Sequence, residues 1–163
     1  MAQDVTELAL KAAFIHNFLK FTEWPKDVLP PSAPLVACVV GDAAFVDVLG
    51  NYVKGHPVAG HDIVVLRIAV DGPPRTCHLV YVSGTTARQA VQIVAALNGA
   101  PVLTLSDMDQ FAQAGGMAQL YVDQGRIRFR INLNNTTGSR LQFSSRLLSL
   151  ATLVRNDPNA IAR

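Results

Sequence analysis

The sequence predicts an α/β fold: one domain over residues 1–163, with a mostly parallel sheet, helices on both faces and a C-terminal antiparallel hairpin. Apolar stretches such as Leu-Val-Ala-Cys-Val-Val at residues 35–40 are typical of parallel strands that are buried on both sides. These stretches alternate with segments of helical periodicity, as in βαβ units. Near the end of the chain, two alternating segments flank Asp123-Gln124-Gly125, a turn sequence that predicts the hairpin.

Periodicity places the expected elements in order along the chain. Helices are expected at residues 4–22, 42–53, 85–97, 107–113 and 144–154. Strands are expected at residues 35–41, 62–69, 78–83, 101–106, 117–123 and 126–133. Pro25 ends the first helix, and Asp-Gly-Pro-Pro at residues 71–74 predicts a turn. The expected N-caps are Asp42, then Thr85 or Thr86, then Ser106 or Asp107.

Composition and charge narrow the class of protein. Half of the 163 residues are hydrophobic and 16% are charged, which suits a globular domain with an ordinary core. The net charge of +2 is too small to predict a nucleic-acid partner. The longest uncharged stretch, residues 89–106, is interrupted by Asn98, Gly99 and Pro101, so no membrane insertion is expected.

Motifs for catalysis are missing from the sequence. It contains no glycine-rich phosphate loop and no nucleophile elbow. His56 and His61 lie in a predicted loop without a third strong ligand nearby. We therefore expect a protein that is not an enzyme and that uses no metal and no cofactor.

The start of the chain leaves the compartment open. Met1-Ala-Gln-Asp has neither the basic start nor the apolar run of a secretory leader. The protein is therefore either cytoplasmic or exported with its leader already removed. The two cysteines bear on the same question. Cys38 and Cys77 are either buried thiols or a disulfide, and a disulfide becomes reachable if the strands at 35–41 and 78–83 are neighbours.

The first helix carries more apolar surface than one sheet requires. One apolar stripe suits docking on the sheet, and a second contains Leu10, Phe14, Phe18 and Phe21, with Trp24 just beyond. Burying three phenylalanines stabilises by roughly 5–9 kcal/mol, so we expect something to cover this face. Either the chain itself covers it, or Phe14, Phe18, Phe21 and Trp24 contact a partner or a second copy.

Two sets of polar residues are the other candidate sites. The first set lies where predicted strands end and helices begin, at the edge where open α/β sheets bind ligands: Asp42, Ser83, Thr85, Ser106 and Asp107. These side chains either cap helices or line a small-ligand site. Arg126, Arg128 and Arg130 alternate along one strand and therefore share a face. That face is either solvated or meets an anion or an acidic partner.

Five motifs, in order along nearly the whole chain, resemble the YfiR family of periplasmic proteins that restrain a membrane-bound diguanylate cyclase. The motifs are Lys11–Pro25 (KAAFIHNFLKFTEWP), Val102–Asp107 (VLTLSD), Phe111–Met117 (FAQAGGM), Arg126–Leu133 (RIRFRINL) and Ser144–Ala151 (SSRLLSLA). Three departures stand out. His16 replaces a usual tyrosine, Arg130 replaces a common acidic residue, and a second cysteine pair found in some relatives around Phe111–Leu120 is missing.

The resemblance implies both a function and a compartment. It implies export to the periplasm, inhibition of the cyclase through its periplasmic part, and lower cyclic di-GMP, with effects on biofilm and exopolysaccharide. It also implies a homodimer, sensitivity to redox state and a disulfide between Cys38 and Cys77. A periplasmic sensor module that binds a small molecule and acts on another membrane signalling protein is the alternative, since related domains occur fused to sensor kinases.

Overall fold

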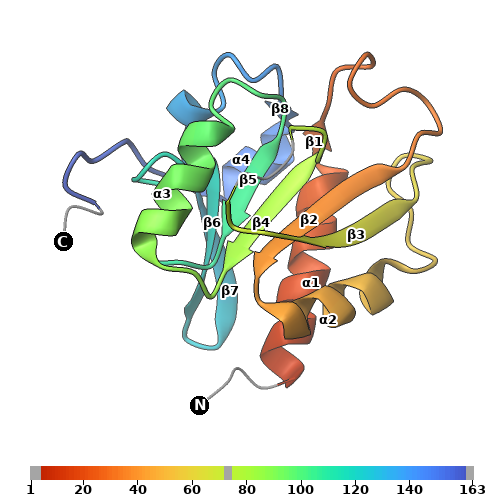
Figure 1. Ribbon diagram of the computed structural model, residues 1–163, viewed down its shortest axis with the longest axis horizontal. Helices are drawn as coiled ribbons and strands as arrows, with labels where there is room; N and C mark the ends of the chain where they lie inside the picture. Colours follow the sequence, from red (N-terminus) through yellow and green to blue (C-terminus); the bar gives the residue numbers. More distant parts are fainter. Residues whose placement is uncertain (1–4, 72–74, 161–163) are drawn as a thin grey trace.

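The computed structural model describes residues 5–71 and 75–160 (Figure 1). The helices are α1 (Val5–Lys20), α2 (Ala43–Val53), α3 (Ala87–Ala96) and α4 (Ser145–Leu150), with a 3-10 helix, η1 (Leu133–Asn135). The strands are β1 (Thr22–Glu23), β2 (Leu35–Gly41), β3 (Ile63–Ile68), β4 (Leu79–Ser83), β5 (Leu103–Ser106), β6 (Ala118–Asp123), β7 (Arg126–Ile131), β8 (Gln142–Phe143) and β9 (Thr152–Leu153). The predicted turn at 71–74 falls largely outside the described residues.

Most of the strands form one mixed sheet. Within the described residues its order is β3-β2-β4-β5-β6-β7-β9, and β1 and β8 pair separately. Neighbouring strands from β3 to β6 are parallel, whereas β6 and β7 form the antiparallel hairpin. The predicted α/β fold with its mostly parallel sheet and its hairpin is therefore confirmed, as is the pairing of β2 with β4.

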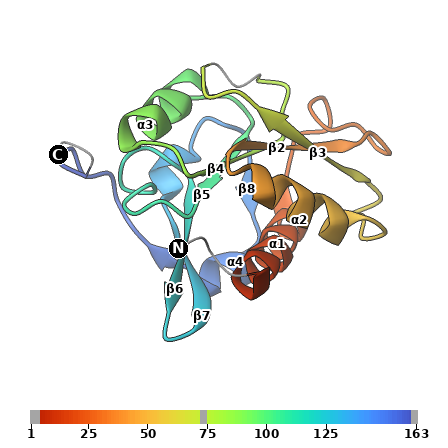
Figure 2. The same cartoon turned by 60° about the horizontal axis from the view of Figure 1, so that its bottom comes forward.

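The sheet is covered on both faces, by different numbers of helices. Helices α1, α2 and α4 lie on one face and α3 lies on the other (Figure 2). Strand β2 shows how the sequence divides between the two cores. Leu35, Ala37 and Val39 pack beneath α1 and α2, whereas Cys38 and Val40 pack on the α3 side. Alternate residues of a strand point to opposite faces, so a continuous apolar run supplies both cores.

Local capping places two helices where the sequence predicts them. Asp42 accepts a hydrogen bond from the backbone N–H of Phe45 at 3.2 Å, which caps α2. Thr86 and Gln89 form a reciprocal capping box at the start of α3. These contacts satisfy N–H groups that have no partner within the helix.

Two predicted helices differ from the structure, the first entirely and the second in its length. No helix forms at residues 107–113, which make turns instead. Gln110 has a φ of 63°, which interrupts helical geometry. The backbone N–H of Ala112 donates to the side chain of Gln119 rather than to a helical carbonyl. The residues there make contacts with β6. A pattern of neighbouring residues cannot predict such contacts.

The C-terminal helix is also shorter than predicted. It covers Ser145–Leu150, and the next residues form β9 alongside β7, with Val154 donating to the carbonyl of Ile131 at 3.0 Å. Without β9, the outer edge of β7 would expose unpaired backbone groups to solvent. The helix α4 therefore ends at Leu150, and the residues of β9 pair with the edge of β7.

Candidate functional site

The aromatic segment of α1 is partly sealed by its own chain. Phe18 has no exposed surface and meets the rings of Phe129 and Phe143 edge-on, with centroids 5.5 and 5.7 Å away. Phe14 also meets Phe129, at 5.2 Å, but remains partly exposed. Edge-to-face pairs stabilise beyond the area they bury. Phe18 is therefore a core residue and offers no area to a partner, unlike the role predicted for it.

Phe21 and Trp24 lie partly buried where α1 leads into the proline-containing loop. The indole Nε1 of Trp24 donates to the backbone carbonyl of His78 at 3.1 Å, and the two rings are perpendicular, with centroids 6.2 Å apart. Trp24 also lines a cavity of about 370 Å³ with Leu29, Val58 and His61. Trp24 thus anchors the loop and leaves part of its ring accessible.

An apolar surface remains at the start of α1. Leu10 is 50% exposed and lies one turn before Phe14, and Val122 at the hairpin is 49% exposed. Val122 is paired in register with Ile127, which is partly buried. The start of α1 and the tip of the hairpin lie at the same end of the molecule (Figures 1 and 2). We call Leu10, Phe14, Val122 and Ile127 the α1–hairpin surface.

The predicted ligand edge is occupied by side chains that bond to one another. Lys11 of α1 is buried, and its Nζ lies 2.9 Å from Asp107 Oδ2 and 3.2 Å from Glu7 Oε2. Ser83 donates to the same Asp107 oxygen at 3.1 Å. Burial, together with the charge of Asp107, raises the pKa of the Tyr81 phenol well above its usual value. This arrangement joins α1 to the sheet at the ends of β4 and β5.

The other residues of that edge act as local structural groups. The Ser106 hydroxyl donates to the carbonyl of Val82 and accepts from the backbone N–H of Met108. Thr85 contacts the sulfur of Met108 at 3.3 Å. Gly41 is required at the end of β2, because a Cβ there would lie 1.9 Å from the carbonyl oxygen of Ser83. The structure therefore brings the predicted edge residues together, and Lys11 is the member that local sequence patterns missed.

The arginines of β7 share one face, as their spacing predicts, while Phe129 and Ile131 point into the core. Arg128 forms a salt bridge of 3.2 Å with Asp123. The guanidinium of Arg130 lies 3.8 Å from the centre of the Tyr121 ring. Arg126 is exposed at the hairpin. Two of the three charges thus have partners on β6, which reduces their mutual repulsion.

The predicted disulfide is present and closes the α3 side of the sheet. Cys38 and Cys77 are bonded, with their Cα atoms 6.1 Å apart. Neither residue is accessible, since their exposed fractions are 0% and 2%. The bond joins β2 to the residues just before β4, inside the core that α3 covers. A reductant in solution therefore has little access to the sulfur atoms while the protein is folded.

His78, next to that disulfide, holds the proline-containing loop to the sheet. Its Nδ1 accepts from the backbone N–H of Val36 at 2.9 Å, so its Nε2 carries the proton and donates to the carbonyl of Val28 at 3.1 Å. Burial lowers the pKa of this imidazole, and the Val28 carbonyl only partly opposes that shift. The geometry thus requires a neutral ring.

The described residues contain few other groups of chemical interest. His16, the departure from the tyrosine pattern, is buried and bonds to the carbonyl of His56 at 2.8 Å. Across residues 5–71 and 75–160, no three His, Cys, Asp or Glu side chains form a group that could hold a metal ion. In the same ranges, no helix combines the length and apolar character that crossing a membrane requires.

The fold and these surfaces define a class: a mixed α/β domain whose outer apolar residues suit contact with another molecule. A family model described as YfiR/HmsC-like matches residues 8–152, which is most of the chain. The chain therefore belongs to the YfiR/HmsC-like family. This membership, implied by the five motifs, fits a periplasmic regulator of a diguanylate cyclase.

Proposed function

We propose that this protein is a periplasmic regulator that binds the outer part of a membrane-bound diguanylate cyclase and holds the enzyme inactive. The outcome is less cyclic di-GMP and hence control of biofilm and exopolysaccharide. Membership of the YfiR/HmsC-like family supports this role. The observation that carries the proposal to particular residues is the α1–hairpin surface, which the described residues leave partly exposed.

The α1–hairpin surface has the features of a contact site. Leu10 and Val122 are each about half exposed, and covering one such side chain fully stabilises a complex by roughly 1–2 kcal/mol of transfer free energy. Phe14 lies one helical turn after Leu10 and contacts the ring of Phe129, so its position is fixed before a partner arrives. A rigid aromatic group costs little entropy on binding, which favours it as an anchor.

The remaining predicted contact residues extend this proposal. Phe21 and Trp24 continue the partly exposed apolar side of the first segment. Arg126 and Arg128 are exposed on the face of the hairpin opposite Ile127, and their charge would attract an acidic partner and increase the association rate more than the affinity. The cyclase is the partner that the family suggests, and a homodimer through the same surface is the competing occupant.

The experiment compares two substitutions that each place one charge on an exposed leucine. Leu10→Asp alters the α1–hairpin surface, whereas Leu66→Asp alters β3, where the side chain is 46% exposed on the α3 side. In a strain that lacks this gene, cyclic di-GMP should rise. Wild type and Leu66→Asp should restore the low level, and Leu10→Asp should fail to do so.

Binding is measured in parallel with membranes that contain a diguanylate cyclase encoded beside this gene. Leu10→Asp should lose association that wild type and Leu66→Asp retain. Sedimentation of the same variants shows whether a dimer depends on Leu10. Unchanged cyclic di-GMP on deletion contradicts the function. Full activity of Leu10→Asp contradicts the surface while leaving the function standing.

A small-molecule sensor is the second candidate, and the contacts at the carboxyl edge of the sheet argue against a site there. Asp42, Ser83, Thr85, Ser106 and Asp107 bond to one another or cap backbone groups, with Lys11 added to them. These contacts use the groups that a ligand would need.

A further inference from the structure

The cavity beside Trp24 lies beyond the C-terminal end of α1 and has a volume of about 370 Å³, at the low end of the range for small-ligand sites. Its walls come from three parts of the chain: residues between 22 and 31, Leu35 at the start of β2, and residues around 58–61 before β3. Leu10 of the α1–hairpin surface lies in the first half of α1, so the two sites are separate.

Much of the lining of this cavity is apolar. Leu29, Leu35 and Val58 have exposed fractions of 8%, 0% and 5%, so these side chains meet a ligand as parts of the core. The ring of Trp24 is partly exposed and lines the same cavity. Two aromatic rings in contact stabilise a complex beyond the area that they bury. The lining therefore favours a ligand with an aromatic body.

Hydrogen bonds hold the walls in place before a ligand arrives. Trp24 Nε1 is fixed by its bond to the carbonyl of His78, as described above. Val58 and His61 exchange two backbone hydrogen bonds, of 2.9 and 2.8 Å, which close the turn between them. The ring of His61 is fixed in turn by the carbonyl of Ala33, 2.7 Å from Nδ1. A site whose walls are already ordered loses less entropy when it binds a ligand.

The ring of His61 has one polar atom without a partner. Because a carbonyl only accepts, Nδ1 carries the proton in the bond to Ala33. In the neutral ring, Nε2 is then an acceptor. Within the described residues Nε2 makes no hydrogen bond, and it does not belong to the buried atoms that lack a partner, so solvent reaches it. A ligand can therefore reach this nitrogen and donate a hydrogen bond to it.

The charged side chains of the lining favour a neutral ligand. Glu23 and Lys26 are both exposed, and they carry opposite charges. Their effects on a charged ligand offset each other, so neither anions nor cations are strongly preferred. The hydroxyl of Thr22 is already used, since it donates to the carbonyl of Phe18 at 2.9 Å. The cavity thus requires one hydrogen-bond donor on a neutral molecule.

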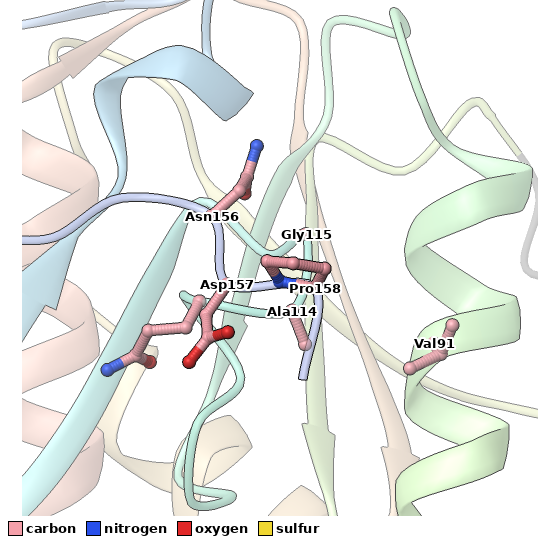
Figure 3. A pocket seen from close by; sticks show the side chains of 7 residues that line it. Val91, Ala114, Gly115, Asn156, Asp157 and Pro158 are labelled. Atoms are coloured by element: carbon pink, nitrogen blue, oxygen red, sulfur yellow. The ribbon is translucent and has the colours of Figure 1, made fainter. Parts of the chain in front are cut away.

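The larger cavity, beside α3, has about 480 Å³ but no comparable acceptor. Figure 3 shows Val91 facing the C-terminal residues across it. The unpaired oxygen of Gln113 is enclosed by protein atoms, beyond the reach of a ligand, and the carboxylate of Asp157 is exposed to solvent. Asn132 and Asn135 use their Nδ2 atoms to fix carbonyls of the adjacent loop, at 2.9 and 2.7 Å. The comparison favours the cavity beside Trp24.

From these features we propose that the cavity beside Trp24 binds small neutral phenols. The phenol O–H donates to His61 Nε2, and the ring of the ligand packs against Trp24 and Val58. This site is independent of the contact with a cyclase and is tested on the purified full chain, so its failure would leave the proposed function standing.

The test uses three probes of similar size: 4-methylphenol, 4-methylanisole, which has no donor, and 4-methylcyclohexanol, which has no aromatic ring. Each is titrated into ¹⁵N-labelled protein at pH 7.5, where the phenol is neutral. Trp24 is the single tryptophan of the chain, so its indole N–H signal reports on the cavity without ambiguity. 4-Methylphenol should shift this signal and the amide signals of Val58, Ala59 and His61 in a saturable way. The other two probes should bind about tenfold more weakly.

A substitution at His61 tests the assigned atom. His61→Phe removes the acceptor and keeps a ring in its place. It should weaken binding of 4-methylphenol about tenfold and leave binding of 4-methylanisole unchanged, so that the preference between the two probes disappears. A change that only disturbed the walls would weaken both probes. His56→Phe, the same substitution at an exposed histidine outside the cavity, is the matched control and should keep the preference of wild type.

Four results would overturn the assignment. The first is equal affinity of wild type for 4-methylphenol and 4-methylanisole, and the second is signal changes located outside the cavity walls. The third is a preference for 4-methylphenol that persists in His61→Phe with the amide spectrum of a folded protein. The fourth is a tyrosine-containing peptide that shifts the cavity signals when 4-methylphenol does not, which would assign the cavity to a partner protein.

Discussion

The face of the sheet beneath α1, α2 and α4 is closed by packed rings, whereas the face beneath α3 has a smaller apolar core that is supplemented by a covalent bond and by side-chain amides. On the first face, Phe18, Phe129 and Phe143 form a continuous aromatic contact. On the second face, α3 has only ten residues and is the one helix that the described chain places there. The Cys38–Cys77 bond and the amides of Asn132 and Asn135 lie on or around that face.

This difference follows from the area that each face can bury. Three helices supply enough apolar surface for rings to interlock, and the stabilisation then comes from burial. One short helix supplies less, so cross-links that restrict the unfolded chain and hydrogen bonds that fix loops contribute a larger share. The face that carries the proposed contact surface therefore relies on packed rings, and the face beneath α3 adds a covalent bond and fixed loops to a smaller apolar core.

The largest expected effect lies in the aromatic contact. Phe18→Ala should lower the free energy of unfolding by about 3–5 kcal/mol, because it opens a cavity among rings that are fully enclosed. Urea denaturation measures this loss. Phe14→Ala is the matched control and should cost less, since Phe14 is partly exposed. Equal losses in the two variants would mean that the two rings are equally enclosed, contrary to the structure.

The next effect concerns the cross-link on the opposite face. Cys38 and Cys77 are 39 residues apart, and replacing both with alanine should lower stability by roughly 3–4 kcal/mol in the chain-entropy model. For a domain of this size, the melting temperature should fall by roughly 10 °C. Wild type that is unfolded and refolded in reductant should show a similar fall.

The burial of the disulfide adds a second measurement. Because the exposed fractions of Cys38 and Cys77 are 0% and 2%, the native protein should react slowly with a reductant and a thiol label. Rapid labelling under native conditions would favour a redox switch at this position. Slow labelling together with the lower melting temperature would identify a bond that stabilises the fold.

The smallest expected effect is a dependence on pH at His78, where the loop joins the sheet. The pKa of His78 is lowered in the folded protein, so the unfolded chain takes up a proton first as the pH falls. The contribution of the neutral ring to the free energy of unfolding is therefore complete above about pH 6.5 and is lost as the pH falls below that value. Denaturation midpoints at pH 7.5 and pH 5.0 measure it.

A substitution separates His78 from the other histidines. His78→Gln keeps a donor and an acceptor but does not titrate, so the decrease in stability between pH 7.5 and pH 5.0 should become smaller. His61→Gln removes a ring that bonds to the carbonyl of Ala33 and whose charge helps to lower the pKa of His78, so it should flatten the pH dependence less than His78→Gln does. If His61→Gln flattens the pH dependence and His78→Gln does not, the assignment to His78 is wrong.

Much of the fold follows from local sequence patterns. The apolar run of β2 predicts a strand buried on two sides, and the spacing of Arg126, Arg128 and Arg130 predicts their common face. Asp42 marks the start of α2 because a short side-chain oxygen satisfies free N–H groups at that point. Each of these features depends on residues within a few positions of one another, so the sequence contains the information directly.

Contacts across the chain could not be predicted in the same way. The side chain of Gln119 accepts a hydrogen bond from the backbone N–H of Ala112, where a helix was expected. Strand β9 pairs with β7, where the last turns of the C-terminal helix were expected. The carboxyl edge of the sheet was predicted as a place where polar residues gather. The contact of Lys11 with Asp107 at this edge was not predicted, because the two residues are 96 positions apart and no local pattern links them.

The sequence by itself determined the alternation of strands and helices, the two-sided burial of the central strands, and the membership of a family through its motifs. Only the tertiary structure decided which side chains of α1 remain exposed. Phe18 and Leu10 belong to the same helical stripe, yet the first is enclosed by Phe129 and Phe143 while the second is half exposed. The physical reason is that burial depends on which distant residues pack against a position, and a helical period specifies only which positions share a face.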